Sequence, residues 1–301
     1  MDKDAALLVE ESELGGRRPK GWSRHLLFGL GVAWSLFQLW ATELGTLDPI
    51  RLRAVHLAFA LALAFLAYPG KRGPKDRVPL LDWALALLGA LGALYVVWDY
   101  YGITQIRGGI PSDRDVVMGT LTLLVLFVAS WRVVGPALPI IASVFILYAL
   151  TGPKGLIPYT LPSWLQLHAG SQWGQLMGQL YTTAEGIWGV PLGVSATFVF
   201  LFVLFGALLD KAGAGHFFIQ AAYALLGHFR GGPAKAAVVA SALTGVVSGS
   251  SVSNTVTTGT FTIPLMKRVG YPPEKAGAVE VASSSNGQLM PPVMGAAARW
   301  P

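Results

Sequence analysis

The feature that most constrains this fold is an uncharged stretch, residues 236–266, with the sequence AAVVASALTGVVSGSSVSNTVTTGTFTIPLM. Two mostly apolar arms, residues 236–247 and 255–266, flank a tip of small polar residues. Each arm is shorter than the ~20 apolar residues that a helix needs to cross a bilayer. We therefore expect a re-entrant helical hairpin that enters the membrane and returns, with its tip near the midplane. Backbone at that depth must be buried in protein or line a wet cavity.

Two simpler interpretations of the tip exist. Runs rich in Gly and Ser are often flexible linkers, but a linker would not be flanked by two short uncharged arms. Residues 248–254 could also only cap two buried helix ends. Five of these seven residues are polar, which is more than two caps require. We therefore favour a binding role for the tip.

The composition indicates that the chain is a membrane protein. Only 13% of the residues are charged and 53% are hydrophobic, whereas about a quarter of the residues of soluble proteins are charged. The net charge of +6 does not indicate nucleic acid, because Lys and Arg cluster at the ends of apolar runs, where they orient membrane proteins. The absence of cysteine excludes disulfides, thiolate metal sites and a cysteine nucleophile. We predict an all-α polytopic membrane protein.

We expect about seven transmembrane spans in addition to the hairpin. They follow a disordered polar tail, residues 1–25, and are predicted at residues 26–42, 55–68, 80–97, 116–131, 136–150, 191–209 and, as a broken span, from Glu274 onwards. The short basic loop at residues 70–78 places the tail and the N-terminus in the cytoplasm. The spans suggest two regions, a four-span region at residues 26–135 and a second region at residues 136–301.

Between the spans we expect pieces that lie at the membrane surface. Residues 152–190 read as an external loop with interfacial segments, because Trp and Tyr favour that depth. Residues 212–230 contain a short amphipathic helix expected on the cytoplasmic surface. Asp82 and Asp99 stand at span ends and are predicted to be interfacial.

A second polar break follows the hairpin. The helix predicted at residues 274–283 stops at Ser284, Ser285, Asn286 and Gly287, and the later pair Pro291 and Pro292 does not continue a helix smoothly. The chain stops a few residues beyond this break, so we expect the front part of something longer.

The two breaks are the predicted binding site. Unwound carbonyls and Ser, Thr and Asn oxygens suit a hard cation such as Na⁺, and secondary transporters build sites where half-helices meet. The half-helix expected to begin near Thr255 directs its N-terminal amides to the same place and favours a carboxylate. The candidate substrate contacts are Ser250, Ser253, Asn254 and Ser285.

Other candidate groups are weaker. Glu280 is a functional suspect as an intramembrane carboxylate, although pairing with Lys275 or an interfacial position would also explain it. It leaves H⁺ open as the coupling ion, whereas the neutral oxygens favour Na⁺. The five histidines show no metal-ligand spacing, and no acid–base–nucleophile set accompanies the serines, so we expect neither a cofactor nor an enzyme.

Several segments resemble one known family. They are GVVSGSSVSN from Gly245, IPLM from Ile263, GYPP from Gly270, AGAVE from Ala276 and GQLMPPVMGA from Gly287. Together they resemble the fused permease of tripartite ATP-independent periplasmic (TRAP) transporters, most closely the TAXI type, in which the small and large membrane subunits are one polypeptide. The specific motifs cover residues 231–298. The earlier spans match in layout more than in motif.

The resemblance implies the first half of an inverted-repeat elevator transporter in a bacterial inner membrane. It implies uptake of a small organic carboxylate, similar to a C4-dicarboxylate, driven by a Na⁺ or H⁺ gradient. The expected partners are a periplasmic substrate-binding protein and membrane lipid, and not nucleic acid. Nothing in the chain resembles the second hairpin, so a membrane fragment that serves only as a scaffold or docking part is the alternative. By resemblance, the ion-binding residues are Ser248, Ser251, Asn286, Gly287, Met290 and Pro292.

Overall fold

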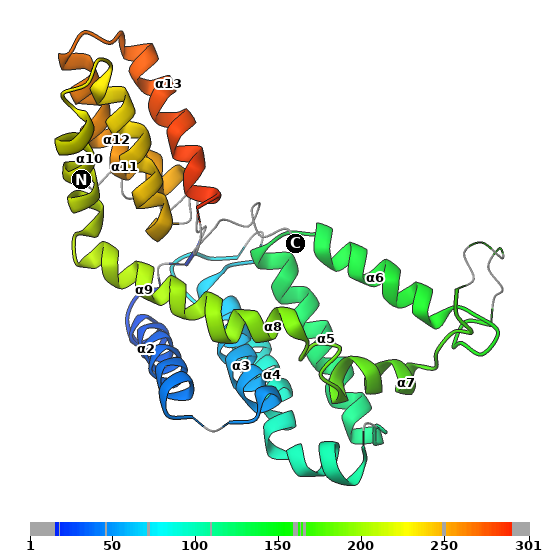
Figure 1. Ribbon diagram of the computed structural model, residues 1–301. Coiled ribbons are helices and arrows are strands. Elements are labelled where there is room, and N and C mark those ends of the chain that lie inside the picture. Colours follow the sequence, from blue (N-terminus) through cyan, green and yellow to red (C-terminus); the bar gives the residue numbers. More distant parts are fainter. Residues whose placement is uncertain are drawn as a thin grey trace. The chain divides into compact units, whose positions relative to one another are not determined.

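The computed structural model describes residues 16–290 apart from a few gaps. The gaps are Arg18, Thr46, Lys71, Arg72, Gly109, residues 159–161, Ser163 and residues 165–166 and 249–250. The chain divides into two compact units, Gly16–Thr197 and a second unit from Phe198 onwards (Figure 1). Each unit is described by itself.

The unit Gly16–Thr197 is built from α-helices and short π-helical turns. In chain order these are α2 (Trp22–Glu43), α3 (Pro49–Ala67), α4 (Leu80–Trp98), η1 (Gly102–Ile106), α5 (Asp113–Val133), α6 (Ala137–Leu150), α7 (Trp173–Met177), η2 (Gly178–Thr182) and α8 (Val190–Val194), followed by η3 (Ser195–Val199). The core lies where α3, α4 and α5 pack together, and Leu61 and Phe65 of α3 are buried there. Gly89 and Gly92 let α4 approach its neighbours closely, since a Cβ at Gly92 would lie 2.3 Å from Thr122 Oγ1.

The helix starts follow local capping rules. Asp48 caps α3 through its side chain, which accepts a hydrogen bond from Ile50 N, and Pro49 occupies the first turn. The second span therefore begins at Pro49, six residues before its predicted start. The helix includes Arg51 and Arg53, which the prediction placed outside it. Ser112 and Asp115 form a capping box at the start of α5.

A buried ion cluster holds the N-terminal segment against this unit. Arg17 forms an ion pair with Asp82 and donates a hydrogen bond to the carbonyl of Phe65 at 2.8 Å. Arg132 approaches the other Asp82 oxygen at 2.7 Å. The prediction of a disordered tail up to residue 25 is therefore wrong from Arg17 onwards. Asp82, in the first turn of α4, is buried in the protein. Residues 1–15 lie outside the described part of the chain.

Two aromatic residues predicted at the membrane interface are instead part of the core. Tyr181 and Trp188 are fully buried. Tyr181 donates a hydrogen bond to the carbonyl of Gly92 at 2.6 Å, and Trp188 Nε1 donates one to the carbonyl of Tyr181. These polar tips find partners inside the protein, so the rings bury their apolar bodies without leaving a donor unpaired.

The second unit is a bundle of helices around the predicted hairpin. It contains α9 (Phe200–Lys211), α10 (Ala214–Leu226), α11 (Gly232–Ser248), α12 (Ser251–Arg268), α13 (Pro273–Ser284) and a 3-10 turn, η4 (Ser285–Gln288). Figure 1 shows α11 and α12 side by side, with α13 beside them, and all three helices contact one another. The apolar face of α10 packs on α11, where Ile219 and Ala222 meet Ala240. The helix predicted at residues 212–230 therefore forms, and it covers the first arm of the hairpin.

The architecture is that of an all-α polytopic membrane protein. Among the described residues, five helical segments are long and apolar enough to cross a membrane: Trp22–Glu43, Pro49–Ala67, Leu80–Trp98, Asp113–Val133 and Val190–Leu209. The last of these consists of α8, η3 and most of α9. The predicted fifth span forms the shorter helix α6, of 14 residues. The described residues form helices and one isolated β-bridge, between Thr151 and Ile157.

Candidate functional site: a hairpin packed on a broken helix

The hairpin forms, but its helices extend further than the sequence predicts. α11 has 17 residues and α12 has 18. Residues 251–254 form the first turn of α12, so this helix begins at Ser251 and not near Thr255. Ser248 ends α11 and Ser253 belongs to α12, whereas Ser250 lies outside the described residues.

The second break also forms. α13 ends at Ser284 and continues as the 3-10 turn η4, in which the carbonyl of Asn286 accepts hydrogen bonds from the amides of Leu289 and Met290 at 2.9 and 3.0 Å. Ser285 is exposed, and its hydroxyl donates to the carbonyl of Val281. Pro292 lies outside the described residues.

The structure brings one end of the hairpin to this break. Gln288 Nε2 of η4 donates a hydrogen bond to Ser251 Oγ, the first residue of α12, at 2.9 Å. The backbones of α11 and η4 also approach closely, since a Cβ at Gly245 would lie 2.7 Å from Gly287 Cα. Both glycines are buried. Ser251, Asn286 and Gly287, which the family resemblance assigns to one ion site, therefore lie on elements in direct contact.

Asn254 lies between the two arms of the hairpin. It is fully buried, its Oδ1 accepts a hydrogen bond from Thr244 Oγ1 at 2.6 Å, and its Nδ2 donates to both oxygens of Ser241 at 2.8 Å. Both donors of the amide are therefore used inside the hairpin. These hydrogen bonds connect α12 to α11. They also leave no donor of the buried amide unpaired, so its burial carries no penalty for a missing hydrogen bond.

The carboxyl of Glu280 is connected to Asn254 by hydrogen bonds through Ser284 and Ser241. It is fully buried and receives hydrogen bonds from the hydroxyls of Thr258 and Thr262 of α12, and from Ser284 Oγ at 3.1 Å. The ion pairs formed by the described residues do not include Glu280, so pairing with Lys275 is not observed. The carboxyl is therefore enclosed by protein groups on α12 and α13.

Sequence reasoning missed the neutral partners of this site. They are Ser241, Thr244, Thr258, Thr262 and Gln288. The one available signal was the spacing of four residues between Thr258 and Thr262, which places both hydroxyls on one face of a helix. Which neighbour that face meets depends on contacts between distant parts of the sequence.

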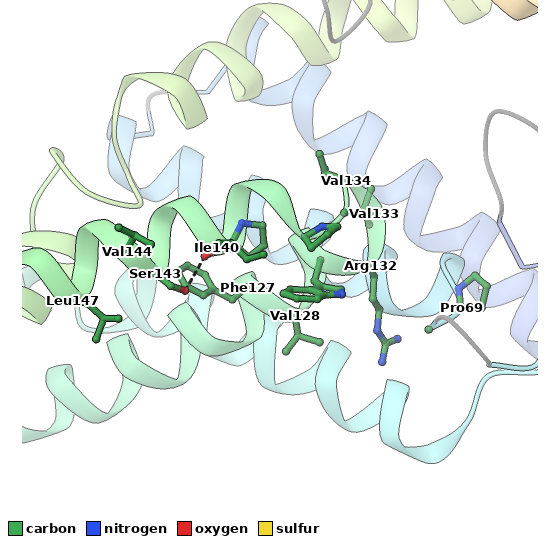
Figure 2. A pocket seen from close by; sticks show the side chains of 15 residues that line it. Pro69, Phe127, Val128, Arg132, Val133, Val134, Ile140, Ser143, Val144 and Leu147 are labelled. Carbon is green, nitrogen blue, oxygen red and sulfur yellow. Dashed lines mark hydrogen bonds between the residues drawn. The ribbon is translucent and has the colours of Figure 1, made fainter.

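A groove in the unit Gly16–Thr197 differs from this site. This groove, of about 830 Å³, is lined by α5 and α6, mainly by apolar residues such as Phe127, Val128 and Ile140, with Arg132 toward one end (Figure 2). The Ser143 hydroxyl in its wall donates to the carbonyl of Pro139 at 2.7 Å. Among the described residues, no group of three or more His, Cys, Asp or Glu side chains could hold a metal ion.

A helical hairpin packed on a broken helix is an arrangement that membrane transport proteins use to build their binding sites. The chain matches, at residues 121–299, the family described as "Tripartite ATP-independent periplasmic transporter, DctM component". This match covers more than half of the chain, and the chain belongs to that family.

Curated relatives are similar to part of the chain. The C4-dicarboxylate TRAP transporter large permease protein DctM of Rhodobacter capsulatus is 37% identical over 91 residues, which are 30% of this chain and 21% of the relative. The protein of that name from Pseudomonas aeruginosa has the same identity and coverage. The ectoine TRAP transporter large permease protein TeaC of Halomonas elongata is 27% identical over 146 residues, 47% of this chain and 34% of the relative.

The chain therefore spans about a fifth of the first two relatives and about a third of the ectoine permease. No solved structure matches the chain.

Proposed function

We propose that this chain forms part of a bacterial inner-membrane permease of the fused TAXI type, with its N-terminus in the cytoplasm. The permease imports small organic carboxylates, similar to C4-dicarboxylates, and is not an enzyme. A gradient of Na⁺ drives uptake, and a periplasmic substrate-binding protein delivers the substrate. The observation that carries this proposal is the contact of Ser251 and Gln288, which joins the start of α12 to the broken helix.

The coupling ion is proposed to bind where these elements meet. Hydroxyl and carbonyl oxygens are suitable ligands for a hard cation. The proposed ligands are the hydroxyls of Ser248 and Ser251, the side chain of Asn286, and the carbonyls of Gly287, Met290 and Pro292. The occupied site would hold the hairpin against α13, so ion binding would favour one arrangement of the hairpin over another.

The carboxylate substrate is proposed to bind beside this ion. α12 begins at Ser251, and the N-terminus of a helix of this length favours an anion through its free amides and its dipole. Ser250, Ser253 and Ser285 are the proposed contacts. Asn254 is proposed to hold the two arms of the hairpin together without contacting the substrate through its amide donors, because both donors already bond Ser241. Dicarboxylate in the names of two relatives supports this substrate class, whereas the third is named for ectoine.

Uptake in proteoliposomes tests the proposal. The permease expressed from its complete natural reading frame is reconstituted with its binding protein and a labelled dicarboxylate, under an imposed Na⁺ gradient. Ser251→Ala is compared with Thr260→Ala, an exposed hydroxyl on the same helix. We expect Na⁺-driven uptake that requires the binding protein and that Ser251→Ala weakens selectively. No uptake of any small carboxylate under any ion gradient would favour the scaffold alternative.

A further inference from the structure

Glu280 is a buried carboxyl whose charge no described cation neutralises. It is fully buried in α13, and Lys275 lies five residues earlier, on another face of the helix. An ionised carboxylate in a protein interior is costly unless it is paired or well hydrogen-bonded. A group of this kind inside a membrane is either held by donors or neutralised by a proton.

The hydroxyls around Glu280 can form hydrogen bonds with its carboxyl group in both the ionised and the protonated form. Thr258 Oγ1 contacts a carboxyl oxygen and also lies 2.7 Å from the carbonyl oxygen of Asn254. Thr262 Oγ1 contacts the other carboxyl oxygen and lies 3.0 Å from the carbonyl oxygen of Thr258. Each hydroxyl has one proton to donate and a choice of two acceptors.

This choice allows a balanced proton exchange. When Glu280 is ionised, Thr258, Thr262 and Ser284 all donate to its two oxygens. When a proton from water adds to the carboxylate, the acid O–H donates to one threonine oxygen, and that threonine turns its own proton to the carbonyl four residues earlier. No polar group is left unpaired in either state.

The groups that face Glu280 do not fix its charge. α12 presents Thr258, Thr262 and Gly259, where an added Cβ would lie 3.1 Å from Glu280 Cγ. α11 contributes Ser241, whose hydroxyl donates to Ser284 Oγ at 3.5 Å. These groups are neutral. From α10, Tyr223 interacts electrostatically with Glu280 and donates to the carbonyl of Pro233 at 3.3 Å.

The same hydrogen bonds connect Glu280 to the proposed ion site. Ser284 and Ser241 lead from the carboxyl to Asn254, which joins the two arms of the hairpin. Gly287 follows Glu280 by seven residues, about 10 Å along a helix. A change in the charge of Glu280 therefore reorients hydroxyls on α12, the helix whose first residue contacts the break.

We propose that Glu280 is a proton-binding site, so that this permease carries H⁺ on a buried carboxyl in addition to the ion at the hairpin. The role of this proton in transport rests on the proposed function. The site itself rests on the burial of the carboxyl and on its switchable hydroxyl partners.

Infrared spectroscopy tests the site without transport. The chain is reconstituted in lipid and its spectrum is recorded as the pH is varied in H₂O and D₂O. We expect the carbonyl-stretch band of a buried carboxylic acid, which shifts on deuteration, disappears on titration and is absent from Glu280→Gln. Glu274→Gln, an exposed carboxyl in the first turn of the same helix, should keep the band. No band that depends on Glu280 at any pH would overturn the proposal.

Transport measurements test the coupling. In the complete permease, Glu280→Gln should lower uptake driven by a proton gradient by roughly tenfold or more, while exchange of labelled for unlabelled substrate continues, because exchange moves no net proton. Glu280→Asp, which keeps an acid, should retain part of the driven uptake. Wild-type uptake by Glu280→Gln under a proton gradient would overturn the coupling. Absence of both uptake and exchange in the wild type would instead refute the proposed function, and the infrared band would still decide the proton site.

Discussion

Replacement of Gly245 by alanine tests the packing between the hairpin and the broken helix. The new Cβ would lie 2.7 Å from Gly287 Cα and 3.2 Å from its amide nitrogen. Carbon atoms pack best at about 3.5–4.0 Å, so α11 and η4 must separate by about 1 Å. The obstacle is backbone, which a side-chain rotation does not relieve.

Overpacking of this kind costs about 1–3 kcal/mol. If the whole cost falls on the arrangement that binds the ion, the apparent ion affinity drops about 5- to 150-fold. The assay is the concentration of the coupling ion at half-maximal uptake by the complete permease, combined with thermal unfolding in detergent. The separation should also break the hydrogen bond between Gln288 and Ser251.

Gly277→Ala is the matched control. Gly277 lies on α13, and no atom lies within 4 Å of an added Cβ. This change should be neutral or should stabilise the protein by up to about 1 kcal/mol. If Gly245→Ala matched Gly277→Ala in both ion dependence and stability, the proposed contact between α11 and η4 would be refuted.

The unit Gly16–Thr197 gives further predictions, all measured by thermal unfolding in detergent. Asp82→Ala leaves the buried Arg17 and the partly buried Arg132 without their shared partner and should cost about 3–5 kcal/mol; a loss below about 1 kcal/mol would contradict the ion cluster. Tyr181→Phe removes a buried hydrogen bond and should cost about 1–2 kcal/mol, and an unchanged stability would argue against that bond. Gly92→Ala drives a Cβ into Thr122 and should cost about 1–3 kcal/mol, whereas Gly29→Ala, which meets nothing within 4 Å, should not destabilise; equal effects of the two changes would exclude the close packing of α4 on α5.

The sequence predicted the hairpin because its signal is local. Two uncharged apolar arms around a polar tip indicate a re-entrant pair of helices wherever the rest of the chain lies. The exact ends were less predictable. Residues 251–254 are small and polar, which favours turns and caps, yet they form the first turn of α12, where such residues are also accepted.

Contacts between distant parts of the sequence were not predictable. Arg17 reads as part of a polar tail until its partner Asp82 is known, and 65 residues separate the two. Tyr181 likewise has the composition of an interfacial residue, and only its bond to Gly92 shows that it belongs to the core.

The sequence identifies Glu280 as an unusual residue, but it does not show which side chains surround its carboxyl. Its position on a helix entering a polar break identified it as a functional suspect. The threonines that contact it come from α12, and a single sequence does not show which helix face they meet. The side chain of Gln288 was overlooked because it follows the Ser- and Asn-rich break and reads as part of the next helix.

Direct binding of the coupling ion tests the central claim, that α12 and the break after α13 form an ion site. Equilibrium binding of radioactive Na⁺ would be measured on the purified complete permease, with K⁺ as competitor. Loss of one charged-ligand contact is worth about 1.5–3 kcal/mol, so Ser251→Ala should weaken Na⁺ binding by roughly tenfold or more. Saturable Na⁺ binding that Ser251→Ala weakens and Thr260→Ala leaves unchanged is the predicted result. Na⁺ binding of equal strength in Ser251→Ala and the wild type would contradict the account.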